Sequence, residues 1–101
     1  DRQIISMPPR EGGFAQYVAI PEANIVTVPD EFSLEKASLA EPIACGWHAV
    51  RLAQEALDRT LSATQCLVIG GGAIGGGAAL SLRAAGAAEI TVSEPNKIRR
   101  D

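Results

Sequence analysis

A glycine-rich turn is the feature that most constrains what this 101-residue chain can fold into. Residues 70–77 read Gly-Gly-Gly-Ala-Ile-Gly-Gly-Gly and directly follow Cys66–Ile69, a short apolar run typical of a buried parallel strand. Ala73–Ala85 predicts a helix that ends at Gly86 as a left-handed cap, and Glu89–Ser93 predicts a second strand. Strand, glycine turn, helix and strand make one βαβ unit, so we expect an α/β fold.

The start of this turn satisfies the G-x-G-x-x-G pattern, which is weak alone but here has a strand before it and a helix after it. Gly70 permits the tight turn, Gly72 lets the backbone approach a pyrophosphate, and Gly75 lets helix and strand pack closely. The pyrophosphate would bind the free N–H groups at the start of the helix. We therefore predict a dinucleotide site, against the alternative of a purely structural glycine turn. The residues expected to contact the dinucleotide are Gly70, Gly72, Ala73, Ile74 and Gly75.

An acidic residue stands at the end of the second predicted strand. Glu94 follows Gly70 by 24 positions, near the spacing of about 20 at which an acid accepts hydrogen bonds from the adenosine ribose hydroxyls. Because a carboxylate there repels a 2′-phosphate, we expect NAD rather than NADP. Arg99 and Arg100 weaken that preference, since an arginine can accommodate the extra phosphate.

The N-terminal half is rich in proline and contains two further candidate strands. Asp1–Gly13 predicts an irregular segment, because its proline and glycine pairs disfavour continuous helix or strand. Phe14–Ile20 and Ile25–Val28 are runs of aromatic and β-branched residues that end at prolines, and each predicts a short strand.

Two helices are expected between these strands and the glycine turn. Ser33 is a good N-cap for a short helix from Leu34 to about Ala40, and Pro42 fits the first turn of a second helix. The apolar positions at helical spacing that predict the packed face of the second helix are Trp47, Val50, Ala53 and Leu57. In the helix after the turn, residues 76–77 are glycines that cost about 1 kcal/mol each relative to alanine. We interpret them as points of close packing against a neighbouring element.

Composition excludes several classes of protein. Nine Lys and Arg against twelve Asp and Glu give a net charge of −3, so no basic surface for nucleic acid is expected. Apolar runs are broken well short of the about 20 residues that a membrane helix needs, and no signal segment is recognised after Asp1. Two cysteines are too few for a disulfide framework. We expect a cytoplasmic protein with reduced thiols, and neither nucleic acid nor membrane as a partner.

Other candidate chemistry is weaker. His48, Cys45 and Cys66 are interpreted, from the residues alone, as packing groups, because no local partner supports a role as ligand or nucleophile. A catalytic zinc needs three protein ligands and an open position. One histidine and two scattered cysteines do not supply that set within this chain.

Several stretches, taken in order, resemble a known family. They are Gly13–Tyr17, Ile25–Asp30, the Glu41-Pro-Ile-Ala-Cys-Gly-Trp-His-Ala stretch, the turn at residues 70–75 and Glu94. Their order and spacing resemble the zinc-dependent medium-chain dehydrogenase/reductase (alcohol dehydrogenase) superfamily, particularly its sorbitol and threonine dehydrogenase-like branch. The resemblance covers about residues 12–101, which is nearly all of the chain.

The resemblance implies a division of the chain and further site residues. Residues 1–41 would form the C-terminal part of a GroES-like catalytic domain, and residues 42–101 would begin a Rossmann NAD-binding domain, so that the chain holds a partial Rossmann fold. Glu41 lies where polyol dehydrogenases place a glutamate that ligates the catalytic zinc or holds its bound water; from the sequence alone it is an ordinary acid at a helix start. Cys45 matches a small residue that faces the nicotinamide ring, and Arg99 matches a basic position near the adenosine.

The implied activity is that of an NAD-dependent, zinc-dependent dehydrogenase, a dimer or tetramer of identical chains, acting on a small secondary alcohol such as a polyol. Because the family's other zinc ligands and later Rossmann strands are missing, we interpret the chain as an internal fragment that is inactive alone. A zinc-free quinone-reductase-like enzyme and a non-catalytic nucleotide-binding module are the alternatives.

Physical reasoning also indicates an incomplete sheet. A doubly wound sheet needs about six strands, and a single βαβ unit would leave open sheet edges and an uncovered face.

One departure from the sorbitol dehydrogenases concerns the segment from Arg51 to Val68, which is longer here. Gln54–Thr60 is expected to extend the helix that begins near Pro42.

Overall fold

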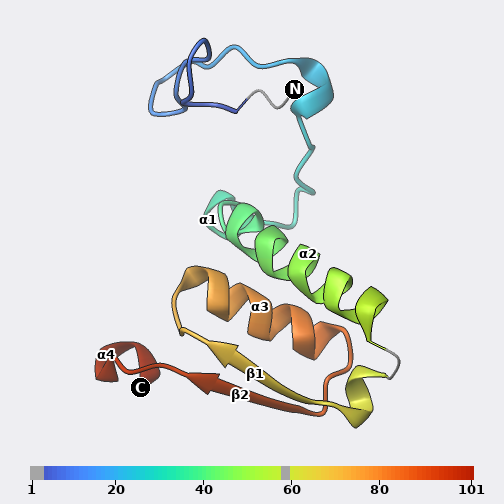
Figure 1. Ribbon diagram of the computed structural model, residues 1–101. Coiled ribbons are helices and arrows are strands. Elements are labelled where there is room, and N and C mark those ends of the chain that lie inside the picture. Colours follow the sequence, from blue (N-terminus) through green and yellow to red (C-terminus); the bar gives the residue numbers. More distant parts are fainter. Residues whose placement is uncertain (1–3, 58–59) are drawn as a thin grey trace.

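The computed structural model describes residues 4–57 and 60–101 and contains the predicted βαβ unit. Strands β1 (Gln65–Ile69) and β2 (Glu89–Ser93) pair in parallel, with Gln65 opposite Glu89 and Ile69 opposite Ser93. Helix α3 (Ala73–Ala84) connects the strands and lies between the sheet and helix α2 (Ala40–Ala56) (Figure 1). The prediction of an α/β fold is confirmed, and the architecture is compatible with the first part of a Rossmann fold.

The N-terminal segment differs from the prediction. Ile4–Gly13 is irregular, as expected, and residues 1–3 lie outside the described part. Phe14–Ile20 and Ile25–Val28 do not form strands; the short 3-10 turn η1 (Glu22–Asn24) lies between them. The predicted strands were wrong because strand residues need a neighbouring strand to satisfy their N–H and C=O groups. This segment lies apart from the α/β layers and pairs with no other strand in the described residues (Figure 1).

The helices before the turn begin where the sequence predicts. Helix α1 (Leu34–Ala37) is capped by Ser33, whose Oγ accepts a hydrogen bond from the Lys36 N–H at 3.3 Å. It is shorter than expected, because the residue predicted to end it, Ala40, instead begins α2. The proline of α2 occupies the first turn, as predicted.

The C-terminal end of α2 contradicts the expected extension through Gln54–Thr60. The helix ends at Ala56, and Leu57 has extended backbone angles (φ −88°, ψ 132°). Residues 58–59 of the expected extension lie outside the described part. Thr60 is again extended, and it precedes the 3-10 turn η2 (Leu61–Ala63) that leads into β1.

A small core joins α2, α3 and β1. Its buried apolar residues are Val50, Leu61, Val68, Leu82 and Ala87. The predicted packed face of α2 was partly wrong, because Trp47 is 54% exposed and the buried residues of the helix are Gly46 and Val50.

Glycines explain this shift of the packed face. A Cβ at Gly46 would lie 2.6 Å from the Gly77 carbonyl carbon, and a Cβ at Gly77 would lie 3.0 Å from the Pro42 oxygen. The two helix backbones therefore touch directly, which no larger side chain would allow. This is the close packing predicted for Gly77; Gly76 instead faces open space.

One face of the sheet has no cover in the described residues. Val68 is buried and Cys66 partly buried against the α3 side, whereas Leu67 and Ile69 are 62% and 84% exposed. The expectation of an uncovered face is therefore confirmed. Among the described helices, none combines the length and the apolar composition that crossing a bilayer requires.

Candidate functional site

The glycine turn is built by the backbone at the carboxyl end of β1. Gly70 has φ +97°, a left-handed conformation that favours glycine, and its N–H donates to the Ser93 carbonyl at 2.8 Å. A Cβ at Gly75 would overlap the Gly70 carbonyl oxygen and lie 3.5 Å from Val68 Cγ1. The first glycine thus makes the sharp turn, and the last lets α3 start directly against the strand.

The N-terminus of α3 opens onto this turn. Gly72 is the N-cap residue, and no side chain in the described residues caps the helix there. The first N–H groups of a helix have no partner within it and carry a partial positive charge. A shallow hollow beside them is lined mainly by Ile69, Gly70, Gly72, Ala73, Ile74 and Gly75. The structure therefore brings the five predicted turn residues together around a surface suited to an anion.

Glu94 lies at the same end of the sheet as the glycine turn and is hydrogen-bonded to it. Its Oε2 accepts a hydrogen bond from the Gly71 N–H at 2.7 Å, and its Oε1 accepts one from the Asn96 N–H at 2.8 Å. These two donors, the Asn96 N–H foremost, lower the pKa of the half-buried Glu94 carboxyl, and the Arg99 charge adds to them while desolvation opposes them. The side chain is therefore held as a carboxylate in a fixed orientation.

Arg99 approaches the turn from helix α4 (Lys97–Arg100). A Cβ built on Gly72 would lie 4.0 Å from Arg99 Nη1, so the guanidinium borders the middle of the turn. The turn thus has a carboxylate and a guanidinium beside the helix N-terminus. The turn after β1 and the segment after β2 lie at the same end of the sheet (Figure 1). Contacts of Glu94 and Arg99 with the turn bring these predicted site residues together there.

The remaining predicted site residues form a separate pair on α2. The Cys45 thiol lies 3.9 Å from Glu41 Oε1, one helical turn away, and both side chains are exposed. His48 is exposed as well, so it is not the packing histidine that the sequence favoured. The described residues contain no group of three His, Cys, Asp or Glu side chains that could hold a metal ion. The described residues alone therefore do not form a zinc site.

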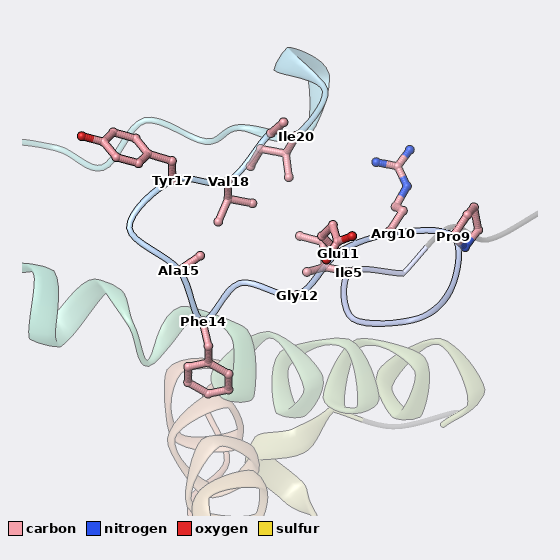
Figure 2. Close-up of a pocket in the computed structure, with 11 residues that line it drawn as sticks. Ile5, Pro9, Arg10, Glu11, Gly12, Phe14, Ala15, Tyr17, Val18 and Ile20 are labelled. Carbon is pink, nitrogen blue, oxygen red and sulfur yellow. The ribbon is translucent and has the colours of Figure 1, made fainter.

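A second hollow lies in the N-terminal segment, away from the turn. It is lined by one stretch that doubles back on itself, with Val18 and Ile20 on one side and Ile5 and Glu11 on the other (Figure 2). Its walls are mainly apolar, and none of the predicted site residues lines it. The predicted site residues therefore lie at the glycine turn and on α2, and not at this hollow.

Comparison with known proteins identifies relatives of this chain. It is 42% identical over 92 residues to the probable diacetyl reductase [(R)-acetoin forming] 2 of Saccharomyces cerevisiae, covering 91% of this chain and 21% of that protein. It is 35% identical over 92 residues to an L-threonine 3-dehydrogenase of Sinorhizobium fredii (91% and 25%). It is 30% identical over 99 residues to a sorbitol dehydrogenase of Bacillus subtilis (98% and 27%). The chain is homologous to a segment of the medium-chain alcohol dehydrogenases.

The resemblance read from the sequence is thereby confirmed, although no family model matches the chain. The chain spans 21% to 27% of the length of these dehydrogenases. Because these matches cover 92 to 99 of the 101 residues, they include the glycine turn.

Two residues at the glycine turn and after β2 were not singled out from the sequence. Gly71 lies inside the G-x-G-x-x-G pattern as a variable position, yet its N–H is one of the two donors that hold Glu94. Asn96 was not singled out, although an asparagine just before a short helix is a recognisable N-cap signal. Its side-chain Oδ1 accepts a hydrogen bond from the Ile98 N–H at 3.0 Å.

Proposed function

We propose that this chain is the nucleotide-binding segment of an NAD-dependent, zinc-dependent dehydrogenase that moves a hydride between a secondary alcohol and NAD. The observation that carries the proposal is the open glycine turn with the Glu94 carboxylate fastened beside it, in a chain homologous to dehydrogenases. In the proposal, residues 42–101 begin the Rossmann domain and residues 1–41 end a GroES-like catalytic domain.

The turn would bind the pyrophosphate of the dinucleotide. Gly70 and Gly72 leave the backbone bare at the turn, and Gly75 allows α3 to start close behind it. Ala73 and Ile74 contribute N–H groups at the helix N-terminus, where an anion is stabilised. NAD, once bound, supplies the hydride acceptor, and these residues supply position and charge.

Glu94 would bind the adenosine ribose. A carboxylate has about four lone-pair sites on its two oxygens, and the Gly71 and Asn96 N–H groups use one on each oxygen. The remaining sites can accept hydrogen bonds from two ribose hydroxyls while the backbone bonds hold the side chain in place. Because a 2′-phosphate would meet this fixed negative charge, NAD is the preferred cofactor. Arg99 would lie near the adenosine and its phosphate.

The zinc part of the proposal depends on the family resemblance. Glu41 would be one zinc-site acid, acting as a catalytic residue that ligates the metal or holds its water, and Cys45 would contact the nicotinamide. Since the described residues do not complete a metal site, the other ligands must come from elsewhere in the whole protein.

The substrate class follows from the relatives' names. Acetoin, threonine and sorbitol all carry a hydroxyl on a secondary carbon, which supports a small secondary alcohol or polyol as substrate for this protein. A zinc-free quinone reductase and a non-catalytic nucleotide-binding module are not favoured by these relatives. A homo-oligomeric assembly and a cytoplasmic location complete the proposal.

The test is an oxidation assay on the whole protein that carries this segment. NAD and NADP are offered with 2,3-butanediol, threonine and sorbitol, before and after zinc is removed with a chelator and restored. We expect NAD reduction with at least one of these alcohols, its loss with the metal and its recovery on adding zinc. Nucleotide binding without any alcohol oxidation would instead indicate the non-catalytic module.

The 101-residue chain alone serves as the comparison in this assay. It is expected to be inactive, because the described residues supply neither a complete metal site nor the rest of a doubly wound sheet. Substrate-dependent reduction of NAD by the chain alone would contradict its interpretation as a fragment.

A further inference from the structure

We propose that Asn96 is a positioning residue that holds α4 so that the Arg99 guanidinium lies at the glycine turn, and that it thereby sets the affinity for the dinucleotide. The inference rests on the proposed nucleotide binding at this turn. It assigns no contact between Asn96 and the ligand.

Asn96 connects the Glu94 carboxylate to α4 through three different groups. Its N–H donates to Glu94 Oε1 at 2.8 Å, and its side-chain Oδ1 accepts from the Ile98 N–H at 3.0 Å. Its carbonyl oxygen accepts from the N–H groups of Arg99 and Arg100, each at 3.2 Å. One residue therefore ties the start of α4 to the acid at the end of β2.

The side-chain bond is the part of this arrangement that α4 depends on most. The helix has only four residues, and such short helices are marginal without fixed ends. Replacing a capping Asn with Ala costs about 1 kcal/mol of helix stability. Without Oδ1, the first turn of α4 would fray, although the backbone bond to Glu94 would remain.

The guanidinium of Arg99 is the group at the proposed site that such fraying would displace. Its guanidinium borders Gly72 and lowers the pKa of the Glu94 carboxyl, so it lies near both sides of the proposed site. A guanidinium binds phosphate strongly only in a defined geometry, because the paired N–H groups must face the oxygens. Since Arg99 is in the first turn of a four-residue helix, its position follows from the cap.

The experiment measures NAD binding by the whole protein that carries this segment, using calorimetry on wild type, Asn96→Ala and Asn96→Ser. We expect Asn96→Ala to weaken NAD binding about three- to tenfold. This is the change in dissociation constant that corresponds to the free energy of one lost helix cap. Asn96→Ser is expected to restore most of the affinity, because a serine hydroxyl can cap the same N–H. Restoration also shows that the loss is not a failure to fold.

A double-mutant cycle with Arg99→Gln separates positioning from a merely structural role. If Asn96 acts through Arg99, then Asn96→Ala should cause no further loss in the Arg99→Gln background. Arg100→Gln is the matched control, because it removes the same charge from the same helix, and Asn96→Ala should still weaken binding in that background.

Three results would overturn the inference: an unchanged affinity in Asn96→Ala, no recovery in Asn96→Ser, or the same fold loss with and without Arg99. The proposed function fails separately, if wild type itself does not bind NAD.

Discussion

The Glu94 carboxylate accepts a hydrogen bond from the Gly71 N–H at 2.7 Å, across the point where β2 ends and the glycine turn begins. This approach needs a small residue at position 71, because a Cβ there would lie 3.1 Å from Glu94 Cβ. The glycine turn therefore holds the acid, in addition to the pyrophosphate-binding role that we propose for it. The carboxylate that we propose to contact the ribose is thus held in place by backbone N–H groups of the chain itself.

Replacing Glu94 with Gln is expected to weaken NAD binding by about tenfold, since charged hydrogen bonds are the stronger ones. The preference for NAD over NADP should also fall, because the neutral amide no longer repels a 2′-phosphate. Fluorescence titration of the whole protein with NADH and NADPH measures both effects. Glu89→Gln is the matched control, because Glu89 Oε2 accepts a hydrogen bond from Gln65 Nε2 at the opposite end of the sheet. An unchanged NADH to NADPH ratio in Glu94→Gln would contradict the assignment.

Acid pH should destabilise the fold partly through Glu94. The two backbone N–H donors hold the pKa of its carboxyl below the ordinary value of 4.5. A group whose pKa is lower in the folded state stabilises the fold above its unfolded pKa and loses that contribution as pH falls through the folded value. Urea unfolding between pH 6 and about pH 2 should show a smaller loss of stability in Glu94→Gln than in wild type. If the free energy of unfolding falls equally with pH in the two proteins over this range, the carboxylate is not stabilised by its partners.

The glycine turn and the βαβ unit were predictable from the sequence because their signals are local. A strand run, a turn that needs positive φ and a helical stretch ending at Gly86 (φ +89°) follow one another directly. Each of these signals depends on neighbouring residues only. The structure accordingly has β2 at the predicted Glu89–Ser93 and α3 within one residue of its predicted end.

The two N-terminal strands were not correctly predicted because strand formation is not local. Phe14–Ile20 has a strand composition, but a strand requires a partner, and the described residues offer none. Close packing at Gly77 was predicted, but its partner Gly46 was not, since the two positions lie in different helices. Asn96 differs, because its cap signal was present locally and was overlooked.

Replacing Gly75 with Ala should destabilise the fold by about 1–3 kcal/mol. The added Cβ would overlap the Gly70 carbonyl oxygen, so either the turn or α3 must move. Gly76→Ala is the control at the next position, where the space is open, and it should stabilise the fold by about 0.5–1 kcal/mol, as Gly to Ala does in helices. Chemical denaturation of both variants measures these changes. The two variants should change the free energy of unfolding in opposite directions. If both are destabilised equally, the steric explanation is wrong.

Replacing Gly46 with Ala should also destabilise the fold, by about 1–3 kcal/mol, because overpacking forces α2 away from α3. Its Cβ would lie 2.7 Å from Ala78 Cα, which is backbone and cannot rotate aside. Gly13→Ala is the control in the N-terminal segment, where nothing lies within 4 Å, and its effect should stay within about 0.5 kcal/mol. If Gly46→Ala is as stable as wild type, the two helices do not pack backbone against backbone.

The uncovered sheet face predicts how the 101-residue chain behaves alone. Leu67 and Ile69 point away from α3 and are mostly exposed, and exposed apolar strands promote association. The sedimentation coefficient of the isolated chain should therefore rise with concentration, and the double variant Leu67→Thr, Ile69→Thr should reduce that rise. Ile98→Thr, which removes an exposed apolar side chain from α4 instead, should leave the rise unchanged. A wild-type chain that stays a monomer at every concentration would show that the open face does not drive self-association.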